Sequence, residues 1–124
     1  VGERPLGGGP AEATPTLVEL SGAADPTPAA CGAGTTFNPE RGAKWVFGNY
    51  GNTLLNHALP PDAAEPDCTN ATQQKARMTA RSRHPGGPNL LWGDGAVRPA
   101  RRGVSLQVWR AAATRAGGEP GQPD

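Results

Sequence analysis

The sequence predicts an α+β fold with a small antiparallel sheet, a C-terminal helix and long Gly/Pro-rich loops. Short apolar runs of strand length recur along the chain, and turn-forming residues bound each run. Apolar residues recur at helical spacing only near the end of the chain. The 18 glycines and 14 prolines among 124 residues make up about a quarter of the chain, which is typical of loop-rich structure. Hydrophobic content is 35%, so we expect one small domain that needs a cross-link or a partner.

The N-terminal part of the chain is expected to contain one strand. Residues 1–12 are rich in glycine and proline and are expected to be irregular. The segment Thr16–Leu20 alternates and contains β-branched residues, which predicts a strand. Residues 21–36 are expected to form a loop, because two X-Pro dipeptides interrupt them.

The middle of the chain predicts three further short strands. Lys44–Phe47 is an apolar run before a turn, and Asn52–Asn56 can follow it as the next strand. Leu59-Pro60-Pro61 requires extended backbone and leads into an acidic segment, 62–67. Met78–Ala80 is expected to form a short strand before the next turn.

The segment from Ser82 to Val97 predicts a β-hairpin. Pro85-Gly86-Gly87-Pro88 ends any preceding regular structure, and the strand Asn89–Trp92 follows. Gly93-Asp94-Gly95 provides the positive φ that a tight hairpin turn requires. Ala96–Arg98 forms the return strand, which Pro99 restricts to an edge.

One helix is expected after this hairpin. Ser105 is a suitable N-cap, and Leu106, Trp109, Ala113 and Ala116 recur at helical spacing. Gly117 suits the position just after the helix. Residues 120–124 are expected to be a frayed tail.

The basic residues are unevenly distributed, although the net charge is only +1. Nine of the twelve lie between Lys75 and Arg115, where Asp94 is the only acid. No exposed aromatic residues are interleaved with these basic residues, and the segment contains no helix of a known nucleic-acid recognition motif. Nucleic acid is therefore not an expected partner. We expect a solvated basic face, or one that meets an acidic neighbouring subunit.

Cys31 and Cys68 lie in loop segments without a CxxC pattern or a His/Cys cluster, so a zinc site is not expected. A disulfide in an exported protein is favoured over two free thiols. The sequence Asn70-Ala71-Thr72 matches the glycosylation sequon, which makes Asn70 a candidate for a surface glycan. Trp45, Trp92 and Trp109 are expected to anchor the core.

His84 and Asp94 are the strongest candidates for chemistry. They could act as an acid–base pair, or they could bind a metal together with His57. We favour a structural interpretation, in which His84 contacts a loop and Asp94 caps its own turn through its side chain. No third catalytic partner stands at a defined spacing. The acidic segment 62–67 lacks the spacing of a calcium loop and is expected to be solvated. No enzymatic activity, cofactor or metal is therefore predicted.

Nine residues separate His84 from Asp94-Gly95, and the motifs around this spacing resemble those of the prepilin-type H-X9-DG family of planctomycete-type bacteria. The similar segments, over about residues 13–119, are Arg41-Gly42 with Trp45, Leu59-Pro60-Pro61 with Cys68, Ser82 to Gly87, Asp94-Gly95, Trp109-Arg110-Ala111 and Thr114 to Glu119 with Gly117-Gly118. Pro99 and Ala96 depart from the pattern, and the family's N-terminal pilin helix does not precede the similar region.

The resemblance implies the globular head of a pilin-like subunit, spanning residues 13–119, in an extracellular filament or pseudopilus on the cell surface. Its partners would be other pilin-like subunits and an apolar helix, supplied by a separate chain or removed from this one, which alone would contact the membrane. We then expect an exposed apolar seam on Thr16–Leu20 and on the helix Leu106–Ala116. The alternative function is a secreted adhesive module that binds anionic glycans.

Overall fold

The computed structural model describes residues 17–114. The predictions for residues 1–12, Thr16, Gly117, Gly118 and the tail 120–124 fall outside the described residues. The described chain divides into two compact units, where the sequence predicted one domain. We name them the disulfide unit, residues 17–54 and 64–78, and the hairpin unit, residues 55–63 and 79–114. Short strands and two short helices confirm the α+β class.

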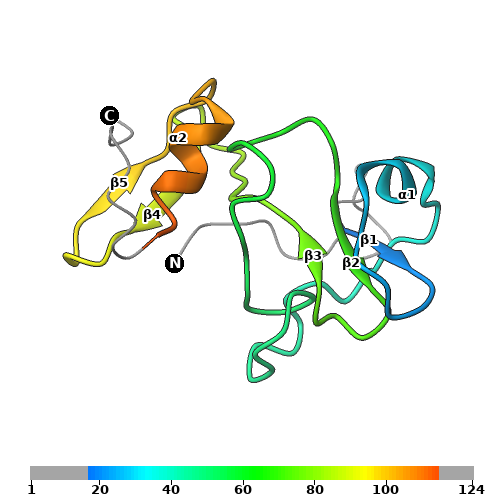
Figure 1. Ribbon diagram of the computed structural model, residues 1–124. Coiled ribbons are helices and arrows are strands. Elements are labelled where there is room, and N and C mark those ends of the chain that lie inside the picture. Colours follow the sequence, from blue (N-terminus) through cyan, green and yellow to red (C-terminus); the bar gives the residue numbers. More distant parts are fainter. Residues whose placement is uncertain (1–16, 115–124) are drawn as a thin grey trace. The chain divides into compact units, whose positions relative to one another are not determined.

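The disulfide unit contains a three-stranded sheet with the order β1-β2-β3 (Figure 1). Its strands are β1 (Leu17–Leu20), β2 (Asp67–Asn70) and β3 (Ala76–Arg77). Strand β1 is parallel to β2, and only β2 and β3 are antiparallel, so the predicted all-antiparallel sheet is wrong here. The long connection between β1 and β2 allows the parallel pairing, because it can return the chain to the starting end of β1. Strand β3 lies just before the predicted Met78–Ala80 strand.

Helix α1 (Pro28–Ala33) lies within the segment that was predicted to be a loop. The Oγ1 of Thr27 accepts the N–H of Ala30 at 3.2 Å, and Pro28 occupies the first turn, where its missing N–H costs nothing. The helix brings Cys31 against β2, and the predicted disulfide with Cys68 is present, with 5.7 Å between the two Cα atoms. Val18 and the two cysteines form the core of this unit.

The predicted strands Lys44–Phe47 and Asn52–Asn56 are wrong, because both segments form turns and irregular backbone. The carbonyl of Asn49 accepts the N–H groups of residues 52, 53 and 54, at 3.2, 3.0 and 3.0 Å. These local bonds satisfy backbone groups that a strand would direct to a neighbour. The apolar residues of the first segment are consequently exposed, and Trp45 is 79% exposed instead of anchoring a core.

The hairpin unit contains the predicted hairpin and the predicted helix (Figure 1). Strands β4 (Asn89–Leu91) and β5 (Val97–Pro99) pair antiparallel. Helix α2 (Leu106–Ala111) starts after Ser105, whose Oγ accepts the N–H of Val108 at 3.3 Å. The helix is shorter than predicted, because its C-cap is Ala112. The core of this unit consists of four buried residues, which are Ala80, Leu90, Ala100 and Trp109.

The predicted apolar seam is absent from the described parts of β1 and α2. Leu17 and Val18 of β1 are fully buried, and so is Trp109 of α2. Trp92 packs against the same core as Trp109, so two of the three tryptophans anchor a core as predicted. No helix within residues 17–114 has the length and apolar character needed to cross a membrane.

Candidate functional site

The carboxylate of Asp94 serves the hairpin turn. Its Oδ1 accepts the N–H of Ala96 at 2.9 Å, and its Oδ2 lies 3.3 Å from Nη2 of Arg98. Gly95, at φ +84°, adopts the left-handed conformation that the turn was predicted to need. The predicted capping of the turn by the side chain of Asp94 is therefore confirmed.

The loop at His84 is held by backbone contacts of the motif. The carbonyl of His84 accepts the N–H of Gly87 at 3.2 Å and Nη2 of Arg102 at 3.3 Å. Gly87 has φ +89°, and a Cβ there would overlap the carbonyl oxygen of Ala100. Nε of Arg102 also donates to Oδ2 of Asp62 at 2.8 Å. The glycine and the arginine thus fix this loop against the end of β5.

His57 does not join His84 and Asp94 in a metal site. Its ring lies against Trp109, with the ring centroids 4.0 Å apart and the planes tilted by 46°. Burial lowers the pKa of His57 below its ordinary value, because the charged imidazolium is poorly solvated there. Within residues 17–114, no group of three or more His, Cys, Asp or Glu side chains is placed to hold a metal ion.

The acidic segment 62–67 is solvated only in part, because Glu65 is 69% exposed whereas Asp62 and Asp67 are held by arginines within the fold. Asp67 forms an ion pair with Arg41, and both side chains are fully buried in the disulfide unit. In the hairpin unit, Asp62 pairs with Arg102 and its Oδ1 accepts the N–H of Ser82 at 2.8 Å. Local sequence carries no signal for the Arg41–Asp67 pair, because its partners lie 26 residues apart.

Asn70 does not present its side chain for a glycan in the folded protein. The residue is 1% exposed, and its Nδ2 donates to the carbonyl of Ala23 at 2.9 Å. Its Oδ1 accepts the N–H groups of Gln74 and Lys75 at 3.1 and 3.2 Å. The sequon asparagine therefore organises the turn between β2 and β3, and the predicted glycosylation does not fit this structure.

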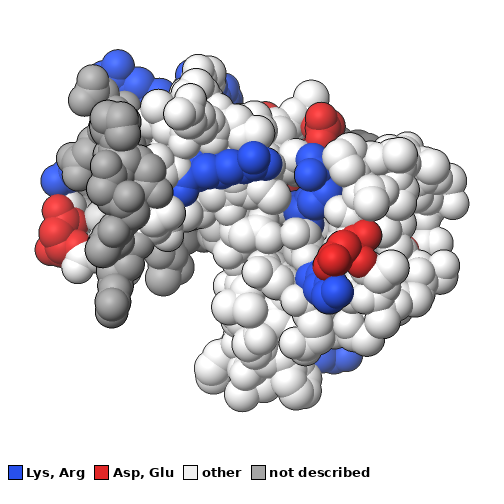
Figure 2. All heavy atoms as spheres, viewed as in Figure 1, with Lys and Arg blue, Asp and Glu red and all other residues white. Residues whose placement is uncertain are grey.

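Several basic side chains from Lys75 onward are solvated as predicted, since those of Lys75, Arg98 and Arg102 are 50%, 60% and 54% exposed, but acidic partners accompany them. The ion pairs formed there are Lys75–Asp25 at 3.0 Å, Arg77–Glu65 at 3.9 Å, Arg98–Asp94 at 3.3 Å and Arg102–Asp62 at 2.8 Å. Arg81 and Arg110 donate to backbone carbonyls of their own unit. Figure 2 shows acidic side chains among the basic ones on the surface. The pairing weakens the basis for binding anionic glycans.

The disulfide unit contains a polar pocket that the sequence did not reveal. Its volume is about 230 Å³. We name it the amide pocket after its lining residues, which are Asn38, Glu40, Lys44, Phe47, Asn49, Gly51, Asn52 and Gln73. Backbone bonds assemble it, because Asn38 donates its N–H to the carbonyl of Leu17 at 2.9 Å and Tyr50 donates to Gln73 at 3.1 Å.

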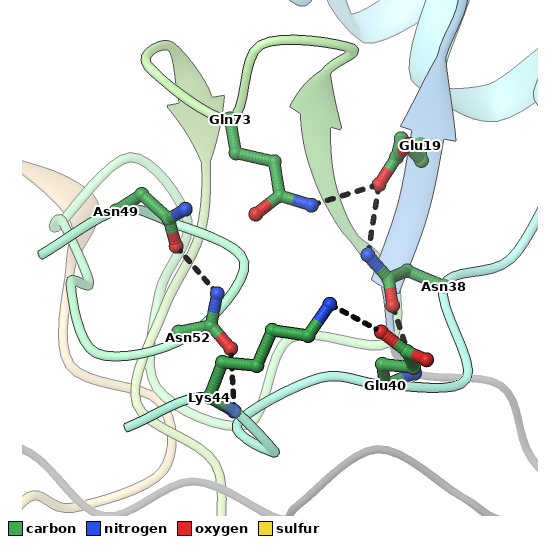
Figure 3. A network of polar contacts seen from close by, with 7 residues as sticks. All are labelled: Glu19, Asn38, Glu40, Lys44, Asn49, Asn52 and Gln73. Atoms are coloured by element: carbon green, nitrogen blue, oxygen red, sulfur yellow. Dashed lines mark hydrogen bonds and ion pairs between the residues drawn. The ribbon is translucent and has the colours of Figure 1, made fainter. Parts of the chain in front are cut away.

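A hydrogen-bond network fixes one side of the amide pocket (Figure 3). Oε2 of Glu19 accepts Nδ2 of Asn38 at 2.8 Å and Nε2 of Gln73 at 3.1 Å. Nζ of Lys44 lies 2.9 Å from Oε2 of Glu40, whose own N–H donates to Oδ1 of Asn38 at 2.8 Å. Glu19 thus orients the side-chain amides of Asn38 and Gln73 on this side of the pocket.

A second set of bonds holds the opposite side of the pocket (Figure 3). Nδ2 of Asn52 donates to Oδ1 of Asn49 at 2.8 Å, and Oδ1 of Asn52 accepts the N–H of Lys44 at 3.0 Å. The side-chain amide of Gln73 lies close against Gly51, so a Cβ at position 51 would displace that amide. The asparagines at 49 and 52 were predicted to belong to a turn and a strand, so no sequence pattern marked them as a site.

Comparison of this chain with protein families, with curated proteins and with solved structures gives no significant match.

Proposed function

We propose that this chain is the globular head of a subunit in a type IV pilin-like extracellular filament or pseudopilus. The observation that carries the proposal is the structural use of the H-X9-DG residues. Gly87 and Gly95 adopt positive φ angles, and Asp94 caps the hairpin with its side chain. The proposal rests on the resemblance of these motifs to the H-X9-DG family, and the turn that their residues build supports a structural role for them.

Exposed apolar residues in the disulfide unit support a role in assembly. Trp45, Val46 and Phe47 are consecutive, and they are 79%, 72% and 54% exposed. Contiguous exposed apolar side chains of this size are typical of surfaces that contact another protein. We propose that this loop, in place of the predicted seam on β1 and α2, meets a neighbouring pilin-like subunit or the apolar helix of the filament.

The disulfide supports a location outside the reducing cytoplasm. The bond between Cys31 and Cys68 lies at the centre of the smaller core, where few apolar side chains are available to stabilise the unit. Such bonds persist in oxidising compartments. An extracellular or cell-surface location follows from this proposal, with the membrane contacted only through the filament helix.

Immunogold electron microscopy tests the proposed function. Antibodies raised against the purified chain are applied to filaments sheared from cells that produce it, and regular labelling along the filaments is expected. A chromosomal Trp45→Glu change should reduce the number of filaments, while the head keeps its disulfide and its thermal midpoint. Gln107→Glu, at an exposed position on α2, is the matched control and should leave filaments unchanged. A native mass equal to one chain, with no labelled filament, would refute the proposal.

A further inference from the structure

We propose that the amide pocket binds a single ring of a neutral sugar. The pocket is contained in the disulfide unit. Phe47 also belongs to the exposed loop proposed above for assembly, so the inference concerns the unassembled chain. Carbohydrate recognition requires polar groups in fixed directions beside an apolar surface. The amide pocket offers both.

Two side-chain amides of the pocket each keep one end available to a ligand, one as a donor and one as an acceptor. Oδ1 of Asn49 is engaged by Asn52 and Nε2 of Gln73 is engaged by Glu19, so each amide is held by one end. The other ends, Nδ2 of Asn49 and Oε1 of Gln73, form no further hydrogen bond within residues 17–114. Figure 3 shows these two ends directed toward the space between them. A donor and an acceptor held in this way match neighbouring sugar hydroxyls, which can donate and accept.

Phe47 supplies the apolar surface of the pocket. It is 54% exposed and lines the pocket, so part of its ring is available to a ligand. One face of a pyranose carries mainly C–H groups, and burying these against an aromatic ring removes apolar area from water. Trp45 belongs to the same loop but does not line the pocket.

The charges around the pocket favour a neutral ligand over a charged one. Glu40 and Lys44 neutralise each other at 2.9 Å, and the second carboxylate is that of Glu19, which holds two amides. An anionic sugar would lose solvation near these carboxylates without gaining an unpaired cation. A basic side chain would meet the ammonium group of Lys44. Both charged classes are therefore disfavoured relative to a neutral polyol.

The size of the pocket limits the ligand to one ring. Its volume of about 230 Å³ lies below the roughly 300–1,000 Å³ of pockets that enclose drug-sized ligands. A ligand with so few buried atoms binds weakly, and we expect a Kd on the order of 1 mM.

Titration of the ¹⁵N-labelled chain with methyl glycosides of glucose, galactose, mannose and N-acetylglucosamine tests the inference. At least one sugar should shift the side-chain amide signals of Asn49 and Gln73 saturably. Phe47→Ala and Asn49→Ala should each weaken binding about tenfold. Trp45→Ala is the matched control, since it removes an exposed aromatic residue outside the pocket, and it should leave the Kd unchanged.

A second variant keeps the test valid if Asn49→Ala disturbs the loop. Gln73→Asn retracts the acceptor and tolerates the positive φ of this position, +55°, so it should also weaken binding while the fold is kept. The inference is overturned if none of the four sugars shifts these amides, or if Trp45→Ala weakens binding as much as Phe47→Ala. Tighter binding of glucuronate or of arginine amide than of every neutral sugar would also overturn it.

Discussion

Replacing Gly87 with alanine should destabilise the hairpin unit more than the same change at any other glycine of the motif. Gly87 has φ +89°, a conformation that costs an L-residue roughly 1–2 kcal/mol. A Cβ at this position would also overlap the carbonyl oxygen of Ala100, which is backbone and cannot rotate away. Ala100 would have to move, although its N–H donates to Pro88 at 2.8 Å and it belongs to the buried core.

The two costs add to a large fraction of the stability expected for so small a core. The displacement of Ala100 weakens one hydrogen bond and one core contact, which is worth on the order of 1–2 kcal/mol. Together with the backbone cost, Gly87→Ala should lower the free energy of unfolding by about 3 kcal/mol. Small domains are stable by only about 5–15 kcal/mol, so the loss is readily measured.

Two neighbouring glycines separate these costs. Gly95 has φ +84° but no heavy atom within 4 Å of the position that a Cβ would take, so Gly95→Ala should cost only the backbone part, roughly 1–2 kcal/mol. Gly86 has neither a positive φ nor a close neighbour, so Gly86→Ala should be neutral or stabilise by up to about 1 kcal/mol. Urea unfolding followed by tryptophan fluorescence suits this unit, because Trp92 and Trp109 lie in its core.

The order of the three variants decides whether the reasoning holds. We expect Gly87→Ala to have the lowest midpoint, Gly95→Ala an intermediate one and Gly86→Ala the highest, with unchanged denaturant slopes. Equal midpoints for Gly87→Ala and Gly95→Ala would refute the predicted contact with Ala100. A loss at Gly86 as large as that at Gly87 would refute the assignment of the turn.

Three further predictions concern other parts of the molecule. Replacing Cys31 and Cys68 with serine should lower the free energy of unfolding by roughly 3–4 kcal/mol, since the bond closes a loop with a sequence separation of 37; equal urea midpoints with and without the bond would contradict this. Asp67→Asn should cost about 3–5 kcal/mol, because it removes the carboxylate that pairs with the fully buried charge of Arg41, and the double replacement Arg41→Met, Asp67→Leu should recover part of the loss. A double variant less stable than Asp67→Asn would argue against this reason. Burial lowers the pKa of His57 in the folded chain below 6.5, so as the pH falls through 6.5 the unfolded chain binds a proton at this residue before the folded chain does, and stability should be lost. His57→Phe should flatten the dependence of the thermal midpoint on pH in this window. An identical pH profile for the variant would show that another group is responsible.

Local chemistry in the sequence was sufficient to predict the hairpin and the start of α2. Both depend on hydrogen bonds between residues a few positions apart. The side chain of Asp94 accepts the N–H of Ala96, and the side chain of Ser105 accepts the N–H of Val108. The same kind of signal was misleading once. The prediction of a loop at Thr27 and Pro28 is wrong, because a threonine followed by proline is also a helix start, and these residues begin α1.

Long-range contacts explain what the sequence could not predict. The apolar run at Trp45 resembles a strand, but a strand needs a partner with unpaired backbone groups, and turns satisfied these groups locally instead. Arg41 and Asp67 are buried only because the fold brings them together. Gln73 reaches Glu19 across 54 residues to form a wall of the amide pocket. The sequence by itself thus determined the elements closed by short loops and the residues of the disulfide. Only the tertiary structure decided the amide pocket, because its side chains meet through the pairing of distant segments. The exposure of the run at Trp45 was decided by the local turns, which left that run without a partner strand.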